Sequence, residues 1–208
     1  MLLHHSFLSS SSWRVRIVLA LKQVDYESEL VDFAAGDHLE PAYRDINPAH
    51  QVPSLEIDDT GTAMRITQSV AICEYLEERY PTPPLLPENP AKRAHVREIV
   101  ELINAGIQPL HNGGLNKSLR RSFGASEDAV KDWKQYWLRS RLGSLEHLVA
   151  ARAGDCALGD RITLADAFLF PQMGKARDYD IDLAPFVTLS RIEHNLAPRP
   201  EFAQTASE

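Results

Sequence analysis

The sequence predicts an α+β protein, in which a small α/β domain precedes an all-helical domain. Two observations lead to this prediction. The first eighty residues alternate between short strand-like segments and longer apolar segments typical of helices. A proline-rich stretch, "PTPPLLPENP", then interrupts the chain, and almost everything beyond it has helical periodicity. We therefore expect domains at residues 1–80 and 91–208, joined by a linker at residues 81–90.

Within the first domain, the expected order is strand, helix, strand, a further helix, two strands and a helix. A short buried strand is predicted for "MLLHH", a helix for "SWRVRIVLALKQV" and a half-exposed strand for "YESELVDF". A hairpin is predicted where "PSLEIDD" and "TAMRI" flank the turn Asp59-Thr60-Gly61. The closing helix is "TQSVAICEYLEERY", and its spacing turns Val70, Ala71, Tyr75 and Leu76 inward.

The second domain should contain four helices, at residues 91 to about 120, 126–151, 163–177 and 186–197. Thr163 and Asp166 have the spacing of a capping box, with Asp in place of the usual Glu or Gln. Ile162 and Ala167 occupy the two positions of a hydrophobic staple around it. These residues favour a structural role at the start of the third helix.

Composition limits the functions that are compatible with the chain. The net charge is −7, which disfavours nucleic acid and anionic membranes as partners, because both require a basic patch. No apolar run approaches membrane-spanning length, and the N-terminus lacks the pattern of a secretion signal. Cys73 and Cys156 are too few for a disulfide framework, and Cys73 has the surroundings of a buried, inert thiol. His4 and His5 lie on a predicted strand and should point to opposite faces, which argues against a metal site. We expect a cytoplasmic globular protein.

Four consecutive serines, Ser9 to Ser12, precede the first predicted helix. Their apolar flanks, Phe7 and Leu8 before and Trp13 after, argue against a flexible linker. A serine at this place can cap the helix. A serine hydroxyl and the free N–H groups of a helix start can also stabilise a thiolate, the reactive form of a thiol. Both roles stay open from the sequence.

A second position with two interpretations is Pro53, between Val52 and Ser54. A proline there can mark an edge or the start of a strand. It can also form a cis peptide bond, which exposes the backbone of the preceding residue to a ligand. The sequence does not distinguish these two possibilities.

Six stretches, spread from about residue 4 to residue 186, together resemble one family. They are "SSSSWRVRIVLALK", "NPAHQVPSLEID", "QSVAICEYLEERYPTPPLLP", "GIQPLHN", "DRITLADAFLFPQ" and "DIDLAPF". In these stretches the chain resembles the zeta-class glutathione transferases, which include maleylacetoacetate isomerases. The resemblance implies a thioredoxin-like N-terminal domain, a helical C-terminal domain, a cis Pro53, glutathione as cofactor and a homodimer.

The resemblance also implies roles for individual residues. Ser9 would activate the glutathione thiol, with Ser10 in support and Ser11 beside them. The backbone of Val52, before Pro53, would pair with the cysteinyl unit of glutathione. The remaining glutathione contacts would come from His38, Gln51, Gln68, Ser69, Gln108 and Asn112.

The chain departs from the family pattern at three positions: the first removes a reactive thiol, and the other two remove positive charge expected to hold an acidic second substrate. Ser11 stands where the class has a cysteine, Leu8 where it has a basic residue, and Asp178 where it has an arginine. Arg14 and Arg177 are candidates to replace the missing positive charge. The leading hypothesis is therefore a glutathione-dependent transferase or isomerase that acts on a small electrophile.

Two further hypotheses remain open. The first alternative is a maleylacetoacetate or maleylpyruvate cis–trans isomerase. The second is a non-catalytic glutathione-binding protein, because a fold alone does not establish chemistry.

Overall fold

The computed structural model describes residues 1–59 and 62–205. The chain forms two compact units, one made of residues 1–85 with the segment that begins at Pro200, and one made of residues 86–199. The first unit contains β1 (Leu2–His5), α1 (Ser10–Leu21), β2 (Glu27–Leu30), the 3-10 turn η1 (Asp37–Leu39), α2 (Pro41–Ile46), β3 (Ser54–Asp59), β4 (Thr62–Thr67), α3 (Ser69–Arg79) and α9 (Pro200–Ala203).

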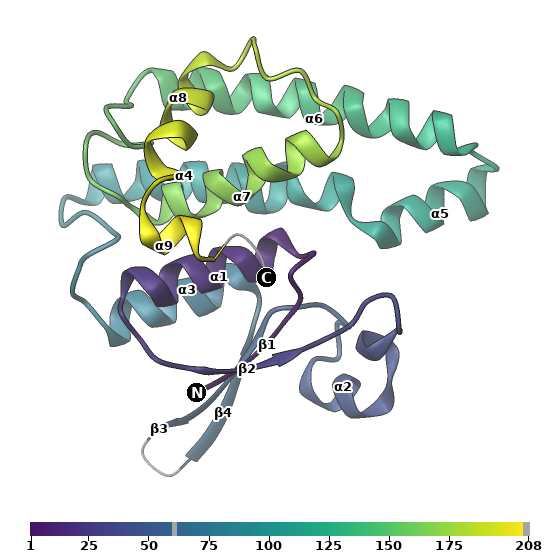
Figure 1. Ribbon diagram of the computed structural model, residues 1–208, viewed down its shortest axis with the longest axis horizontal. Coiled ribbons are helices and arrows are strands. Elements are labelled where there is room, and N and C mark those ends of the chain that lie inside the picture. Colours follow the sequence, from purple (N-terminus) through teal and green to yellow (C-terminus); the bar gives the residue numbers. More distant parts are fainter. Residues whose placement is uncertain (60–61, 206–208) are drawn as a thin grey trace. The chain divides into compact units, whose positions relative to one another are not determined.

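The four strands form one sheet in the order β2-β1-β3-β4 (Figure 1). β1 pairs parallel with β2 and antiparallel with β3, and β3 and β4 are antiparallel neighbours. The predicted succession of strands and helices is confirmed, and it is the thioredoxin-like arrangement. Thr60 and Gly61, which belong to the predicted turn, lie outside the described residues.

The two faces of the sheet carry different helices. Figure 1 shows α1 and α3 on one side and α2 on the other. Side-chain alternation along β1 agrees with this view, because His5 bonds to Arg16 of α1 whereas the ring of His4 packs against Tyr43 of α2. The two histidines therefore point to opposite faces, as predicted.

The inward face of α3 differs in part from the prediction. Its buried side chains are Ser69, Ile72, Cys73 and Leu76, whereas Ala71 is exposed. The predicted burial of Leu76 is confirmed and that of Ala71 is wrong. The stripe that packs on α1 passes through residues 69, 72, 73 and 76, the i, i+3, i+4, i+7 spacing of one helix face.

The second unit consists of helices. They are α4 (Pro90–Gly106), the 3-10 turn η2 (Gln108–His111), α5 (Gly113–Phe123), α6 (Glu127–Ala150), α7 (Leu164–Asp178) and α8 (Val187–Leu196). The predicted single helix from 91 to about 120 is wrong, because the chain breaks at residues 107–112. Pro109 explains the break, since it lacks an N–H group and its ring obstructs a continuous helix. The other three predicted helices are confirmed to within one residue at each end.

Helix α7 is the most buried element of this unit. At its start, Asp166 accepts hydrogen bonds from the backbone N–H of Thr163 at 2.8 Å and from that of Ala157 at 2.7 Å. The predicted capping box is confirmed. Burial nevertheless raises the pKa of Asp166 from its ordinary value of 3.8 to about 6.

The last described residues, 200–205, belong to the first unit, although the sequence predicts them as part of the helical domain. The reason is visible in two side chains: Phe202 is fully buried, and Thr205 is hydrogen-bonded to α1. The predicted domain limits otherwise stay a prediction. Within the described residues, every helix is too short or too polar to cross a membrane.

Candidate functional site

Four chain segments leave the sheet of the first unit at one end. Ser54, at the start of β3, lies opposite His4 of β1 and opposite Thr67, the last residue of β4. The last residues of β1 and β2, His5 and Leu30, lie opposite each other. Four loops therefore meet the sheet at the same end: those that follow β1, β2 and β4, and the one that precedes β3. These loops and the helix starts that follow them contain every residue that the resemblance assigns to glutathione within this unit.

The first segment leads into α1, and Ser9 is the residue that caps this helix. Its backbone is extended, and its Oγ accepts a hydrogen bond from the N–H of Ser12 at 3.2 Å. Ser10, the first helical residue, is only 4% exposed, and in the described part of the chain its hydroxyl makes no hydrogen bond. Ser11 is half-buried. Because capping uses a lone pair of the Ser9 oxygen, the hydroxyl proton of Ser9 stays available for a sulfur atom.

The second segment ends in a cis peptide bond between Val52 and Pro53, in agreement with the resemblance. The carbonyl oxygen before it, that of Gln51, accepts hydrogen bonds from the Tyr43 hydroxyl at 2.7 Å and from the Asn47 amide at 2.6 Å. This carbonyl is therefore held in a fixed orientation. Among the described residues, the backbone N–H and C=O of Val52 make no hydrogen bond, so they can pair with the backbone of a peptide ligand.

The third segment leads into α3. Gln68 precedes this helix with a φ of 75°, and its side-chain amide donates to the side-chain oxygen of Gln51 at 3.2 Å. Both glutamine side chains are exposed, so two predicted ligand contacts lie next to each other. The first residue of the helix, Ser69, is buried.

Arg14 lies beneath the start of α3. Its side chain is fully buried, and it donates a hydrogen bond to the Ser69 hydroxyl at 3.3 Å. A guanidinium group and the positive end of a helix dipole together favour a carboxylate at this place. The sequence offers Arg14 as a contact of the second substrate, and this role stays a prediction. The full burial of the side chain and its bond to Ser69 do not favour it.

The fourth segment, after β2, contains His38 in η1. The His38 ring packs edge-to-face on Phe33, with 4.8 Å between ring centroids. Its carbonyl oxygen pairs with the ring of His50 at 3.1 Å, which connects this loop to the segment before Pro53. His38 is thus held near the loop of Gln51 by contacts within the same unit.

Cys73 lies on α3, below the start of the helix. The side chain is completely buried, and burial raises the pKa of its thiol to about 12. A thiol in this state is neither a nucleophile nor a metal ligand. The predicted burial of Cys73 is confirmed, and its inertness stays a prediction that the raised pKa supports.

Two predicted site residues of the second unit lie at the two ends of its 3-10 turn. Gln108 begins η2, and Asn112 caps α5 by accepting from the N–H of Gly114 at 2.9 Å. The turn is fixed by the Tyr179 hydroxyl, which donates to the carbonyl oxygen of His111 at 3.2 Å. The break in the helix therefore has a consequence for the site, because it sets where Gln108 and Asn112 are displayed.

The charged residues at the end of α7 already have partners. The Arg177 guanidinium bonds to both carboxylate oxygens of Glu193 on α8, and this pairing raises the pKa of Arg177. Asp178 forms an ion pair with Lys175, one helical turn earlier, at 2.6 Å. The suggestion that Arg177 replaces a missing positive charge is weakened accordingly. Leu8, in the first unit, is 68% exposed.

The sequence reasoning overlooked Glu193, Tyr43 and Asn47. Glu193 is nearly buried and neutralises Arg177, although it stands sixteen residues away in sequence. Tyr43 and Asn47 orient the carbonyl group before Val52. Asn47 could have been found, because it opens the stretch "NPAHQVPS" that carries the resemblance, whereas nothing local identifies Tyr43 or Glu193.

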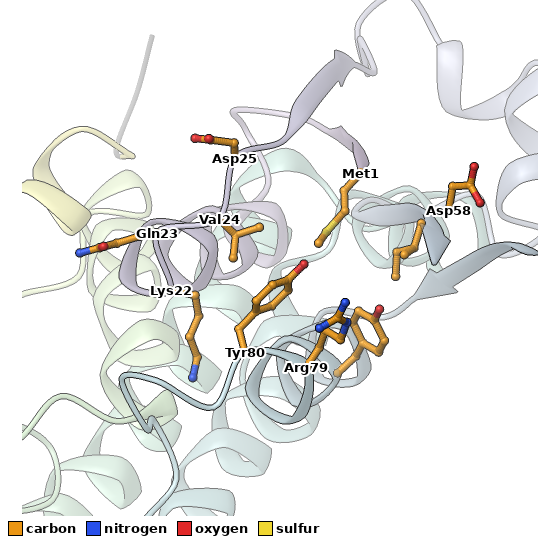
Figure 2. Close-up of a pocket in the computed structure, with 10 residues that line it drawn as sticks. Met1, Lys22, Gln23, Val24, Asp25, Asp58, Arg79 and Tyr80 are labelled. Carbon is orange, nitrogen blue, oxygen red and sulfur yellow. The ribbon is translucent and has the colours of Figure 1, made fainter. Parts of the chain in front are cut away.

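A cavity of about 510 Å³ lies at the other end of the same sheet (Figure 2). Met1, Asp58, Arg79 and Tyr80 are among the residues that line it. These residues come from the start of β1, the end of β3 and the end of α3, so the cavity is remote from the end of the sheet where the four loops meet. It contains no predicted site residue and does not locate the site.

The sequence and the fold are similar to those of known proteins. Residues 8–79 match the glutathione S-transferase N-terminal domain. The chain is 40% identical to the maleylacetoacetate isomerase of Mus musculus, over 94% of this chain and 87% of the mouse protein. It is similar to a holo structure of maleylpyruvate isomerase, a bacterial zeta-class glutathione S-transferase, with 36% identity, a TM-score of 0.93 and coverage of 99% and 96% of the two chains.

A further solved structure shows a ligand. It is the maleylacetoacetate isomerase of Anaeromyxobacter dehalogenans, with dicarboxyethyl glutathione and citrate bound in its active site. The identity is 38%, the TM-score is 0.89, and the match covers 98% of this chain and 92% of that chain. On this evidence, the chain belongs to the maleylacetoacetate isomerase family, the zeta class of the glutathione transferases.

Proposed function

We propose that this protein is a glutathione-dependent cis–trans isomerase of maleylacetoacetate or maleylpyruvate. The observation that supports the proposal is that the four segments assigned to glutathione leave the sheet at the same end. The chain that contains them is similar over almost its full length to isomerases of this family. The isomerase alternative thereby becomes the leading hypothesis, ahead of a general transferase.

Each part of glutathione has a counterpart in the first unit. Gln68 and Ser69, at the positive end of α3 and above Arg14, suit the γ-glutamyl carboxylate. The backbone groups of Val52 suit the cysteinyl unit, and Ser9 suits the sulfur. His38 and Gln51 suit the glycyl end.

Bound glutathione supplies a thiolate that adds reversibly to the cis double bond, so that rotation about the resulting single bond and loss of the thiolate give the trans product. The Ser9 hydroxyl donates a hydrogen bond to the sulfur, and the N–H groups of the first turn of α1 add positive potential. Both effects lower the pKa of the thiol, which is ordinarily near 8.5 and therefore mostly protonated at neutral pH. The chain thus favours the reactive form of the thiol without a basic side chain.

The direct test is to mix the protein and glutathione with maleylpyruvate and to follow the loss of the cis acid. We expect turnover that requires glutathione and that falls strongly in Ser9→Ala. Retention on immobilised glutathione without any turnover would instead identify a non-catalytic binding protein.

A second candidate function is transfer of glutathione to a neutral electrophile. The exposed Leu8 and the pairing of Arg177 with Glu193 favour it, because both reduce the positive charge available to a dicarboxylate. Turnover of neutral electrophiles in the absence of isomerisation would establish this function. We also propose a homodimer, as the resemblance implies, and the mass in solution measured by light scattering tests it.

A further inference from the structure

The C-terminal segment of the chain returns to the first unit and lies against α1 (Figure 1). The indole N–H of Trp13 donates to the hydroxyl oxygen of Thr205 at 3.1 Å. That hydroxyl donates in turn to the backbone of α9, with the carbonyl oxygen of Glu201 at 2.9 Å and that of Phe202 at 3.1 Å. The direction of these bonds is fixed, because an indole N–H can only donate and a carbonyl oxygen can only accept; the single hydroxyl proton of Thr205 is shared between the two carbonyl oxygens. Phe202, fully buried, anchors the segment.

A second contact joins the same residue to the end of the sheet. One nitrogen of the Arg16 guanidinium donates to the carbonyl oxygen of Thr205 at 3.0 Å, and another donates to Nδ1 of His5 at 3.0 Å. The guanidinium also lies 4.7 Å from the centre of the Phe7 ring. Arg16 therefore connects the end of β1, the loop that precedes Ser9 and the C-terminal segment.

His5 can act as an acceptor because it is neutral. Burial, with a smaller effect of the neighbouring Arg16, lowers the pKa of His5 to about 4. At neutral pH its Nδ1 carries a lone pair, which receives the Arg16 proton. The bond network around Thr205 is therefore complete under physiological conditions.

These contacts reach the cap of α1 through one residue. The backbone N–H of Trp13 donates to the carbonyl oxygen of Ser9 at 3.0 Å, the bond that opens the helix. The side chain of Trp13 is thus fixed by Thr205 while its backbone fixes Ser9. Through these two bonds, a displacement of Trp13 should move the Ser9 hydroxyl and the N–H groups of the first turn.

We propose that Thr205 is a positioning residue for the thiol-activating end of α1. The inference rests on the proposed role of Ser9. Small errors in the aim of a preorganised donor have large effects on catalysis, because the donor must point to where the charge develops. In this chain residues 200–205, more than a hundred residues beyond the sheet in sequence, help to orient the Ser9 hydroxyl.

The test compares Thr205→Val, which keeps the shape but removes the acceptor of Trp13, with Thr205→Ser, which keeps the hydroxyl. Asn195→Ala is the control, since it removes a side-chain hydrogen bond to a backbone carbonyl in the second unit. For Thr205→Val we expect kcat to fall by about threefold to tenfold and the pKa of the bound thiol, read from the thiolate absorbance, to rise. The glutathione Kd should change by less than about twofold. Thr205→Ser should restore both values.

Two results would overturn the proposal. One is an unchanged thiol pKa in Thr205→Val; the other is a fall in kcat that only follows the fraction of folded protein. A separate measurement is independent of glutathione: amide hydrogen exchange at residues 12–16 should accelerate in Thr205→Val and not in Asn195→Ala. Unchanged exchange refutes the positioning role even if the protein is an isomerase, whereas accelerated exchange in a protein that does not bind glutathione refutes only the proposed function.

Discussion

The two regions that contain the predicted site differ in how their polar groups are engaged. At the sheet end of the first unit, the Ser10 hydroxyl and the backbone of Val52 make no hydrogen bond within the described residues, while buried Arg14 supports Ser69 from below. At the end of α7, Arg177 and Asp178 are each paired with an opposite charge. In the first region the Ser10 hydroxyl and the Val52 backbone are without an internal partner among the described residues, whereas the charged side chains of the second region are paired with each other.

The largest expected effect comes from Ser9, on which the first region depends. Ser9→Ala removes the proposed donor to the thiolate and should lower turnover by about a hundredfold. It also removes a helix cap, at a cost of about 0.5–2 kcal/mol of stability. Steady-state kinetics and chemical denaturation measure the two effects separately.

A matched control exists in the second unit, because Ser126 caps α6 in the same way, accepting from the N–H of Ala129 at 3.2 Å. Ser126→Ala should lose similar stability and keep its turnover. If both variants lose turnover equally, the effect of Ser9→Ala is one of folding and the assigned role of Ser9 is wrong.

The second effect is a difference in pH response between the two units. The pKa of His5 is lowered from 6.5 to about 4, so the unfolded state binds the proton first, and stability present above pH 6.5 is lost as the pH falls toward 4. The pKa of Asp166 is raised from 3.8 to about 6, so its contribution has the opposite sign and increases as the pH falls through 6. As the pH falls from 6.5 to 5, the titration of His5 should lower the free energy of unfolding of the first unit by about 2 kcal/mol.

Amide hydrogen exchange in α1 and α7, corrected for the intrinsic rate at each pH, measures this difference. His5→Asn and Asp166→Asn each remove one titration, and the asparagine oxygen can accept a hydrogen bond in place of the imidazole nitrogen of His5 or a carboxylate oxygen of Asp166. His5→Asn should flatten the pH dependence in α1 alone. An equal response of both helices in the unaltered protein would contradict the assignment.

The third effect concerns Gln68, which tests whether a side chain or a backbone holds the γ-glutamyl carboxylate. Gln68→Ala should weaken glutathione binding about tenfold, the value of one charge-assisted hydrogen bond, with little change in kcat. Gln68→Gly is the informative control, because glycine accepts the φ of 75° without strain. Titration calorimetry should give the same loss for both variants; a loss confined to Gln68→Ala would mean that backbone geometry, not the amide, is responsible.

The smallest effect is expected in the second region. The double variant Leu8→Arg with Asp178→Arg should improve kcat/KM for a dicarboxylate relative to a neutral electrophile by about threefold to tenfold. The gain is limited because the Asp178 side chain is 57% exposed and already paired with Lys175. The control is the double variant Leu8→Arg with Asp180→Arg, which keeps Asp178. It makes the same change of charge at an exposed residue paired with Lys131, and it should leave the substrate preference unchanged. Equal gains in both would indicate a general effect of charge.

Much of the fold was predictable because it is local. The strands of the first unit, the helix that begins at the serines, the capping box at Thr163 and three helices of the second unit follow from periodicity and capping residues in short windows. Pro53 was correctly assigned as cis only through the resemblance, because the sequence itself left two conformations open. The break at Pro109 was missed although proline is its cause, since the apolar spacing on both sides favours one continuous helix.

The sequence by itself determined which elements form and which motifs carry the family resemblance, because both depend on residues close together along the chain. Only the tertiary structure decided that Arg14 supports Ser69, that Glu193 neutralises Arg177, and that Thr205 fixes Trp13. These pairs are separated by 55, 16 and 192 residues. Hydrogen bonding and charge pairing act over a few ångströms in space, and a sequence pattern has no means of representing which distant side chains packing will bring to that distance.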